Sequence, residues 1–149
     1  MAKKTPPQAD VSLETVADLR VALRRFEAAT ERLAAANQLT ARQYDLLALL
    51  HAPSRSGSLA SAIADQLSIS RNAMTELVSR AAAAGLVDRG DDAADARRKP
   101  LKPTAEGTRR FTAAVKALTP ERDHLLELLR NAAQATEQLT AGTPEVSEP

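Results

Sequence analysis

The side chains best suited to chemistry in this 149-residue chain lie in two polar clusters between residues 70 and 102. Short hydroxyl and amide side chains alternate with arginines in the first cluster, and one acid precedes several bases in the second. Such groups form hydrogen bonds with the base edges and phosphates of nucleic acids. The clusters are Ser70, Arg71, Asn72, Thr75, Ser79 and Arg80, and then Asp95, Arg97, Arg98, Lys99 and Lys102.

Outside these two clusters, few residues have the types and spacing of a catalytic site. The chain has no cysteine, which excludes disulfides, thiolate metal sites and cysteine redox sensing. It has no nucleophile elbow, no glycine-rich phosphate loop and no His and acid residues at metal-ligand spacing. His51 and His124 are isolated, and such histidines are more often surface or partly buried residues than catalysts. We therefore expect neither an enzyme nor a bound cofactor.

Composition limits the fold and the location of the protein. Hydrophobic residues make up 44% of the chain and aromatic residues only 2%, so the core must be aliphatic. The net charge of +1 does not indicate a nucleic-acid partner, which has to be inferred from the positions of the charges. No apolar run reaches membrane-spanning length, and residues 1–10 lack the apolar stretch of a signal peptide. A soluble, cytoplasmic protein without a membrane partner is expected.

Helical periodicity covers the first third of the chain. Residues 11–37 carry apolar side chains three, four or seven positions apart, which predicts one long helix. Thr40 and Gln43 have the spacing of a capping box and predict the start of a second helix, which Pro53 stops.

The next segment predicts two short helices joined by a tight turn. Residues 59–67 suit the first of them, Ser70 caps the second, and Gly85 ends it in the left-handed conformation. One face of the second helix is apolar, and the first polar cluster occupies the opposite face. The apolar face consists of Met74, Leu77, Val78 and Ala81.

After Gly85 the pattern changes to that of a strand pair. The segments "LVDRG" and "PLKPT" predict a hairpin, in which Pro100 and Pro103 restrict the return strand to a short edge. Thr104 caps a fifth helix, and Thr119 with Pro120 starts a sixth. The expected fold is mainly α with a small two- to three-stranded β wing, that is, a winged helix-turn-helix lobe with a further helical region.

A polar helix face alone is weak evidence for nucleic-acid binding, because such faces are usually only solvated. Glu76 also places a carboxylate on this helix, which repels phosphate. The preceding turn and the following hairpin strengthen the interpretation, because together they form a DNA-binding unit. A winged-helix module that binds only proteins is the alternative, and the basic cluster from Arg97 to Lys102 argues against it.

The segment from Leu59 to Gly107 resembles the core of the MarR family of winged-helix transcriptional regulators. The resemblance covers about one third of the chain closely and includes the spacing from an Asp-x-Arg motif to a Thr-x-x-Gly motif. Its matching residues are Leu67, Ser70, Arg71, Thr75, Leu77, Val78, Gly85, Leu86, Val87, Arg89, Asp95, Arg97, Arg98, Leu101, Thr104 and Gly107.

The resemblance implies a homodimer that binds double-stranded DNA. Residues 11–37 and 105–139 would form the helical dimerisation region, and residues 38–104 the winged helix-turn-helix lobe. Residues 1–10 and 140–149 have the composition of disordered tails. Two recognition helices would then meet half-sites about 34–36 Å apart on a pseudo-palindromic operator, most simply as a repressor.

The resemblance also implies roles for the second polar cluster. Arg97 would enter the minor groove, Asp95 would orient it, and Arg98 and Lys99 would contact phosphates.

Regulation by a ligand is a further implication of the resemblance. A small aromatic or phenolic ligand would release the DNA, and the second helix would border its pocket. Arg42, Tyr44 and His51 lie on that helix and are equally plausible as ordinary helix residues.

Overall fold

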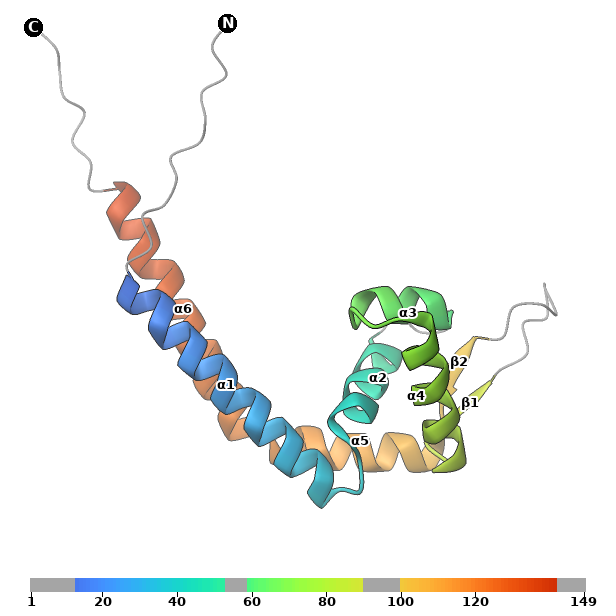
Figure 1. Cartoon of the computed structure of the whole chain (residues 1–149). Helices are drawn as coiled ribbons and strands as arrows, with labels where there is room; N and C mark the ends of the chain where they lie inside the picture. Colours follow the sequence, from blue (N-terminus) through green and yellow to red (C-terminus); the bar gives the residue numbers. More distant parts are fainter. Residues whose placement is uncertain (1–12, 53–58, 90–99, 142–149) are drawn as a thin grey trace, which may run out of the picture. The chain divides into compact units, whose positions relative to one another are not determined.

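The computed structural model describes residues 13–52, 59–89 and 100–141, which form six helices and one two-stranded sheet (Figure 1). This confirms the predicted fold class, with two strands in the wing. No helix within these ranges is long and apolar enough to cross a membrane. The elements are α1 (Leu13–Ala36), α2 (Ala41–His51), α3 (Ala60–Gln66), α4 (Arg71–Ala83), β1 (Val87–Arg89), β2 (Leu101–Pro103), α5 (Ala105–Ala117) and α6 (Thr119–Ala141).

The chain divides into two compact units. The winged lobe, Thr30–Leu118, holds the end of α1, the helices α2 to α5 and the sheet. The helical unit consists of Met1–Ala29 and Thr119–Pro149 and holds most of α1 and all of α6. Within the winged lobe α5 packs against α2 and β2. The dimerisation region expected over residues 11–37 and 105–139 stays a prediction.

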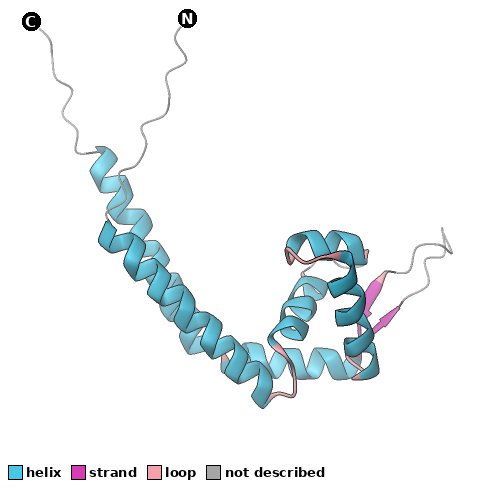
Figure 2. Cartoon of the chain, in the orientation of Figure 1, coloured by secondary structure: helices cyan, strands magenta, loops and turns pink. Residues whose placement is uncertain are grey.

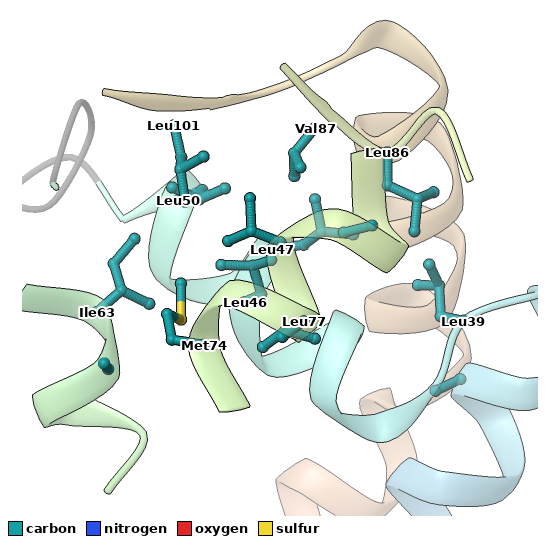
Figure 3. Packing of buried hydrophobic residues seen from close by; sticks show 14 of the residues in the cluster. Leu39, Leu46, Leu47, Leu50, Ile63, Met74, Leu77, Leu86, Val87 and Leu101 are labelled. Carbon is teal, nitrogen blue, oxygen red and sulfur yellow. The ribbon is translucent and has the colours of Figure 1, made fainter. Parts of the chain in front are cut away.

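The core of the winged lobe is aliphatic, as the composition predicts. Side chains from α2, α3, α4 and the two strands point into one space between these elements (Figure 3). Tyr44 and Phe111 lie only at its edge. Burial of each such aliphatic side chain contributes about 1.5–3 kcal/mol. The largest fully buried side chains are Leu46, Leu47, Ile63, Leu86, Leu101, Val78 and Val87.

The strands β1 and β2 form a short antiparallel hairpin beside α4 (Figure 2). Val87 pairs with Pro103, and Arg89 pairs with Leu101. Proline has no N–H group to donate, so its presence agrees with the prediction of a short edge strand. The segment 90–99 that joins the strands lies outside the described residues.

Side-chain caps begin three helices of the winged lobe at the positions that the sequence predicts. Thr40 and Gln43 form the complete capping box of α2, with hydrogen bonds of 3.2 and 2.9 Å. The hydroxyl oxygens of Ser70 and Thr104 accept from the third backbone N–H group of α4 and α5. In contrast, α6 begins at Thr119 itself, one residue earlier than predicted.

The helical unit contains α1 and α6 as an antiparallel pair, side by side in Figure 1. Ala22 and Phe26 line one groove together with Leu125, and Leu19 lines another with Leu128. Val16 and Leu23 lie on the apolar face of α1 and are exposed in this structure, whereas the small Ala22 and Ala29 are buried. Within residues 13–29 and 119–134 of this unit, the exposed large apolar side chains are Leu13, Val16, Val21, Leu23, Leu126 and Leu129.

A left-handed residue makes the turn between α3 and α4. Ser68 has φ of 52°, a conformation that glycine adopts without strain. We therefore expect Ser68→Gly to raise the free energy of unfolding by about 0.5–1 kcal/mol. Urea denaturation would measure this, with Ser79→Gly as the control, because the same change inside the exposed face of α4 should lower stability. A loss of stability in Ser68→Gly would contradict the prediction.

Candidate nucleic-acid interface

The helix α4 separates apolar from polar side chains. Its apolar face, Met74, Leu77, Val78 and Ala81, is buried in the core of the lobe. The polar side chains predicted to contact DNA lie at the surface, which leaves them accessible to a partner. These exposed residues are Ser70, Arg71, Asn72, Thr75, Ser79 and Arg80.

Local hydrogen bonds fix the turn that joins α3 to α4. The backbone N–H of Ile69 donates to the carbonyl of Ala64 at 3.1 Å, which closes the turn after α3. The Ser70 hydroxyl then accepts from the backbone N–H of Ala73 at 3.2 Å and starts α4. The first turn of α4 therefore emerges from a fixed turn, with Arg71 and Asn72 exposed on it.

Besides Ser70, two further exposed side chains have partners within α4. The Thr75 hydroxyl donates to the carbonyl of Arg71 at 3.0 Å. Arg80 forms an ion pair with Glu76, which lies one turn earlier in α4. This pairing weakens the repulsion that Glu76 alone would exert on a phosphate, and it also lowers the charge that Arg80 offers.

The second polar cluster is described only in part. Asp95, Arg97, Arg98 and Lys99 lie outside the described residues, so the roles predicted for them stay predictions. Lys102 is exposed on β2, in register with the exposed Asp88 of β1.

Thr104 ties the start of α5 to the end of α4, a contact that the sequence analysis did not anticipate. Its hydroxyl donates to the carbonyl of Gly85 at 2.6 Å and accepts from the backbone N–H of Gly107 at 2.9 Å. Its backbone N–H donates to the carbonyl of Leu86 at 3.0 Å. Thr104 thereby fixes the base of the wing, and the Thr-x-x-Gly spacing was the signal for it.

Arg109 is exposed and Arg110 is half-buried at the start of α5, and both bind Glu106. Arg109 makes two hydrogen bonds of 2.8 Å to this carboxylate, and Arg110 makes one of 2.7 Å. These bonds, first that of Arg109, lower the pKa of Glu106 to about 2. Arg110 also donates to the carbonyl of Gln38 at 3.2 Å. The two arginines thus have structural partners within the lobe.

The aromatic residues of α2 pack against α5. The ring of Phe111 lies 4.8 Å from that of His51, stacked, and 5.2 Å from that of Tyr44. Nδ1 of His51 donates to the carbonyl of Leu47 at 2.8 Å, and Nε2 lies 3.1 Å from the Thr108 hydroxyl. His51 and Tyr44 therefore act at least as packing residues between α2 and α5.

Arg42, the third residue considered for a ligand, lines a groove between the start of α2 and α4 together with Ile69 and Arg80. Nearby, burial raises the pKa of Asp45, and the positive charge of Arg42 opposes this shift. Among the residues that the structure describes, no three His, Cys, Asp or Glu side chains are grouped to hold a metal ion.

The order of helix, turn, helix and antiparallel hairpin makes the lobe a winged helix-turn-helix. Residues 37–98, which cover most of this lobe, match the model of the MarR family. This match confirms the resemblance of the winged lobe to the MarR family. A comparison with curated proteins gives no significant match.

Solved structures of the same fold cover most of the chain. MepR, a transcription regulator of the Staphylococcus aureus multidrug efflux pump MepA, matches with a TM-score of 0.68 and 19% identity over 89% of this chain and 99% of its own. CouR from Rhodococcus jostii RHA1, bound to p-coumaroyl-CoA, matches with a TM-score of 0.67 and 22% identity. The match covers 94% of this chain and 100% of the CouR chain. The structure of S. aureus MepR in complex with DNA matches with a TM-score of 0.60 and 21% identity. The match covers 83% of this chain and 96% of the MepR chain. At these identities the similarity concerns the fold.

Proposed function

We propose that this protein is a transcriptional regulator that binds double-stranded DNA in a sequence-specific manner. The observation that carries the proposal is the arrangement of α4, whose apolar face is buried while its polar N-terminal turns are exposed. A helix of this kind presents amide, hydroxyl and guanidinium groups to base edges in the major groove. The MepR–DNA complex, which shares the fold, supports the same use of this lobe.

The proposed regulator acts as a homodimer, most simply as a repressor. Among the side chains that the structure describes, the helical unit exposes six large apolar ones on α1 and α6. A second copy of the unit would cover such a surface, and a two-fold dimer would present two α4 helices to a pseudo-palindromic operator. In this proposal Arg97 of the wing enters the minor groove, Asp95 orients it, and Arg98 and Lys99 contact phosphates.

Release from DNA by a small organic ligand completes the proposal. CouR, which has the same fold, was crystallised with p-coumaroyl-CoA. Screening small aromatic and phenolic acids for loss of DNA binding would test this part, and it would fail if none of them changed the affinity.

The salt dependence of binding to random duplex DNA tests the central claim. Contacts with phosphates release counterions, so the affinity should fall steeply as the salt concentration rises. No binding at low salt would reject DNA as the partner and favour a protein-interaction module. In vitro selection of bound DNA would then test the two-fold symmetry of the site.

Asn72 and Lys99 should affect binding in different ways. Asn72→Ala is expected to cost about 1–3 kcal/mol at one base position and to relax the preference there, because an exposed amide on α4 reads a base edge. Lys99→Ala, as the control, should weaken all sequences about equally and lower the salt slope by about one. Binding-site selection with both variants measures this, and equal effects on sequence preference would contradict the distinction.

A further inference from the structure

A groove lies between α3 and the first two turns of α4. Its volume is about 370 Å³. The side chains that line it come equally from the two helices of the helix-turn-helix. They are Ala60, Ser61 and Ala64 of α3 and Arg71, Met74 and Thr75 of α4.

The floor of this groove is apolar and its rim is polar. Ala64 and Met74 are 3% and 2% exposed, so the groove is backed by the core of the lobe. Ser61, Arg71 and Thr75 are exposed around it. The groove therefore opens beside the exposed polar turns of α4, and the Arg71 guanidinium gives its rim a positive charge.

The hydroxyl of Thr75 is not the part of this side chain best placed to contact a ligand. It donates its proton to the carbonyl of Arg71, one turn earlier, at 3.0 Å. The hydrogen bond fixes the rotation of the side chain and leaves its methyl group for contacts outside the helix. Together with the methyl groups of Ala60 and Ala64 of α3, it makes an apolar site beside the exposed polar face of α4.

The groove on the other side of α4 has a different character. Glu76 and Arg80 form an ion pair there, and Arg42 and Thr40 also line it. The Glu76 carboxylate at this rim repels phosphate, although its ion pair with Arg80 weakens the repulsion. The groove between α3 and α4, which has a cation and no carboxylate among its lining residues, is the better complement to DNA.

We propose that the groove between α3 and α4 receives the 5-methyl group of a thymine in the major groove, with the Thr75 methyl group as the specificity-determining contact. Thymine is the base that shows a methyl group in the major groove, and alanine and threonine methyl groups are its usual partners. Arg71 holds the DNA beside this base by its charge. The inference rests on the proposed function and adds the chemical group that α4 recognises.

Deoxyuridine substitution tests the inference on the protein as it exists. The probe is the duplex obtained by in vitro selection, in which each thymine of one half-site is replaced in turn by deoxyuridine, which lacks only the methyl group. The wild-type protein should lose affinity about fourfold at one or two of these positions, the effect of removing one methyl contact. The other thymines should show no change.

Two variants of Thr75 assign that loss to its methyl group. Thr75→Ser keeps the hydroxyl and removes the methyl group, so it should bind the thymine and deoxyuridine duplexes equally. Thr75→Val keeps a methyl group and removes the hydroxyl, so the fourfold preference for thymine should persist. Because Thr75 is exposed, both changes leave the core intact, and thermal unfolding would verify this.

The outcomes separate the inference from the proposed function. Binding of the selected DNA with no sensitivity to any deoxyuridine would overturn the inference and leave the regulator in place. A preference for thymine that persists in Thr75→Ser would likewise overturn the inference and leave the regulator in place. Failure of the protein to bind any duplex at low salt would overturn the proposed function, and the inference with it.

Discussion

Gly107→Ala is expected to lower the free energy of unfolding of the winged lobe by about 3 kcal/mol, the upper part of the range for overpacking. A Cβ atom on Gly107 would lie 2.0 Å from the carbonyl oxygen of Leu86 and 2.9 Å from its carbonyl carbon. This neighbour is backbone, held by a hydrogen bond of 3.0 Å from Thr104. The clash can be relieved only by separating α5 from the start of β1.

The sign of this effect makes the test decisive. In an exposed helix, alanine in place of glycine stabilises by about 1 kcal/mol, so without the close contact Gly107→Ala would increase stability. Urea denaturation followed by circular dichroism gives the free energy directly. An increase in stability would show that α5 does not approach Leu86 this closely.

Gly85→Ala is the matched control for this experiment. Gly85 has φ of +69°, and a Cβ atom there would meet nothing within 4 Å. Only the backbone strain of a left-handed alanine remains, which costs about 1–2 kcal/mol. The two glycines therefore separate the cost of a steric clash from that of conformation, with the larger loss expected at Gly107.

The sequence predicted those features that depend on neighbouring residues. The caps at Thr40, Ser70 and Thr104 each need partners within three positions, so residue type and spacing are sufficient to place them. The two faces of α4 follow from helical periodicity for the same reason.

Features that depend on distant residues were not predicted. Periodicity places Val16 and Leu23 on one apolar face of α1, but it does not give the partner that covers this face, and both side chains are exposed in the single chain. The stacking of His51 on Phe111 joins residues 60 positions apart. In the candidate site, the sequence predicted that Thr75 is exposed. It did not predict the hydrogen bond that the Thr75 hydroxyl donates to the carbonyl of Arg71, because this bond depends on the side-chain conformation as well as on the spacing.

Replacing Leu126 and Leu129 together by glutamate is expected to convert the proposed dimer into a monomer. These side chains are 40% and 43% exposed on α6, and a dimer interface over the helical unit would bury them. An unpaired buried charge costs about 3–5 kcal/mol, or about two to four orders of magnitude in the dissociation constant of the dimer. Light scattering coupled to size exclusion would measure the change in mass.

The affinity for a two-half-site operator should fall with the dimer. Two linked lobes bind with a high effective concentration for the second half-site, so a monomer should bind about 100-fold more weakly or worse. Binding to a single half-site should change little, because the winged lobe carries neither substitution. This pair of duplexes distinguishes loss of the dimer from loss of the DNA-binding surface.

Arg130→Glu is the matched control, because it changes the net charge by the same two units on an exposed position of the same helix. It should leave the mass and the affinity for the operator close to those of the wild type. An unchanged dimer in the variant with both leucines replaced would place the interface elsewhere. Equal disruption by Arg130→Glu would instead attribute the effect to charge, since the apolar surface of α6 is intact in that variant.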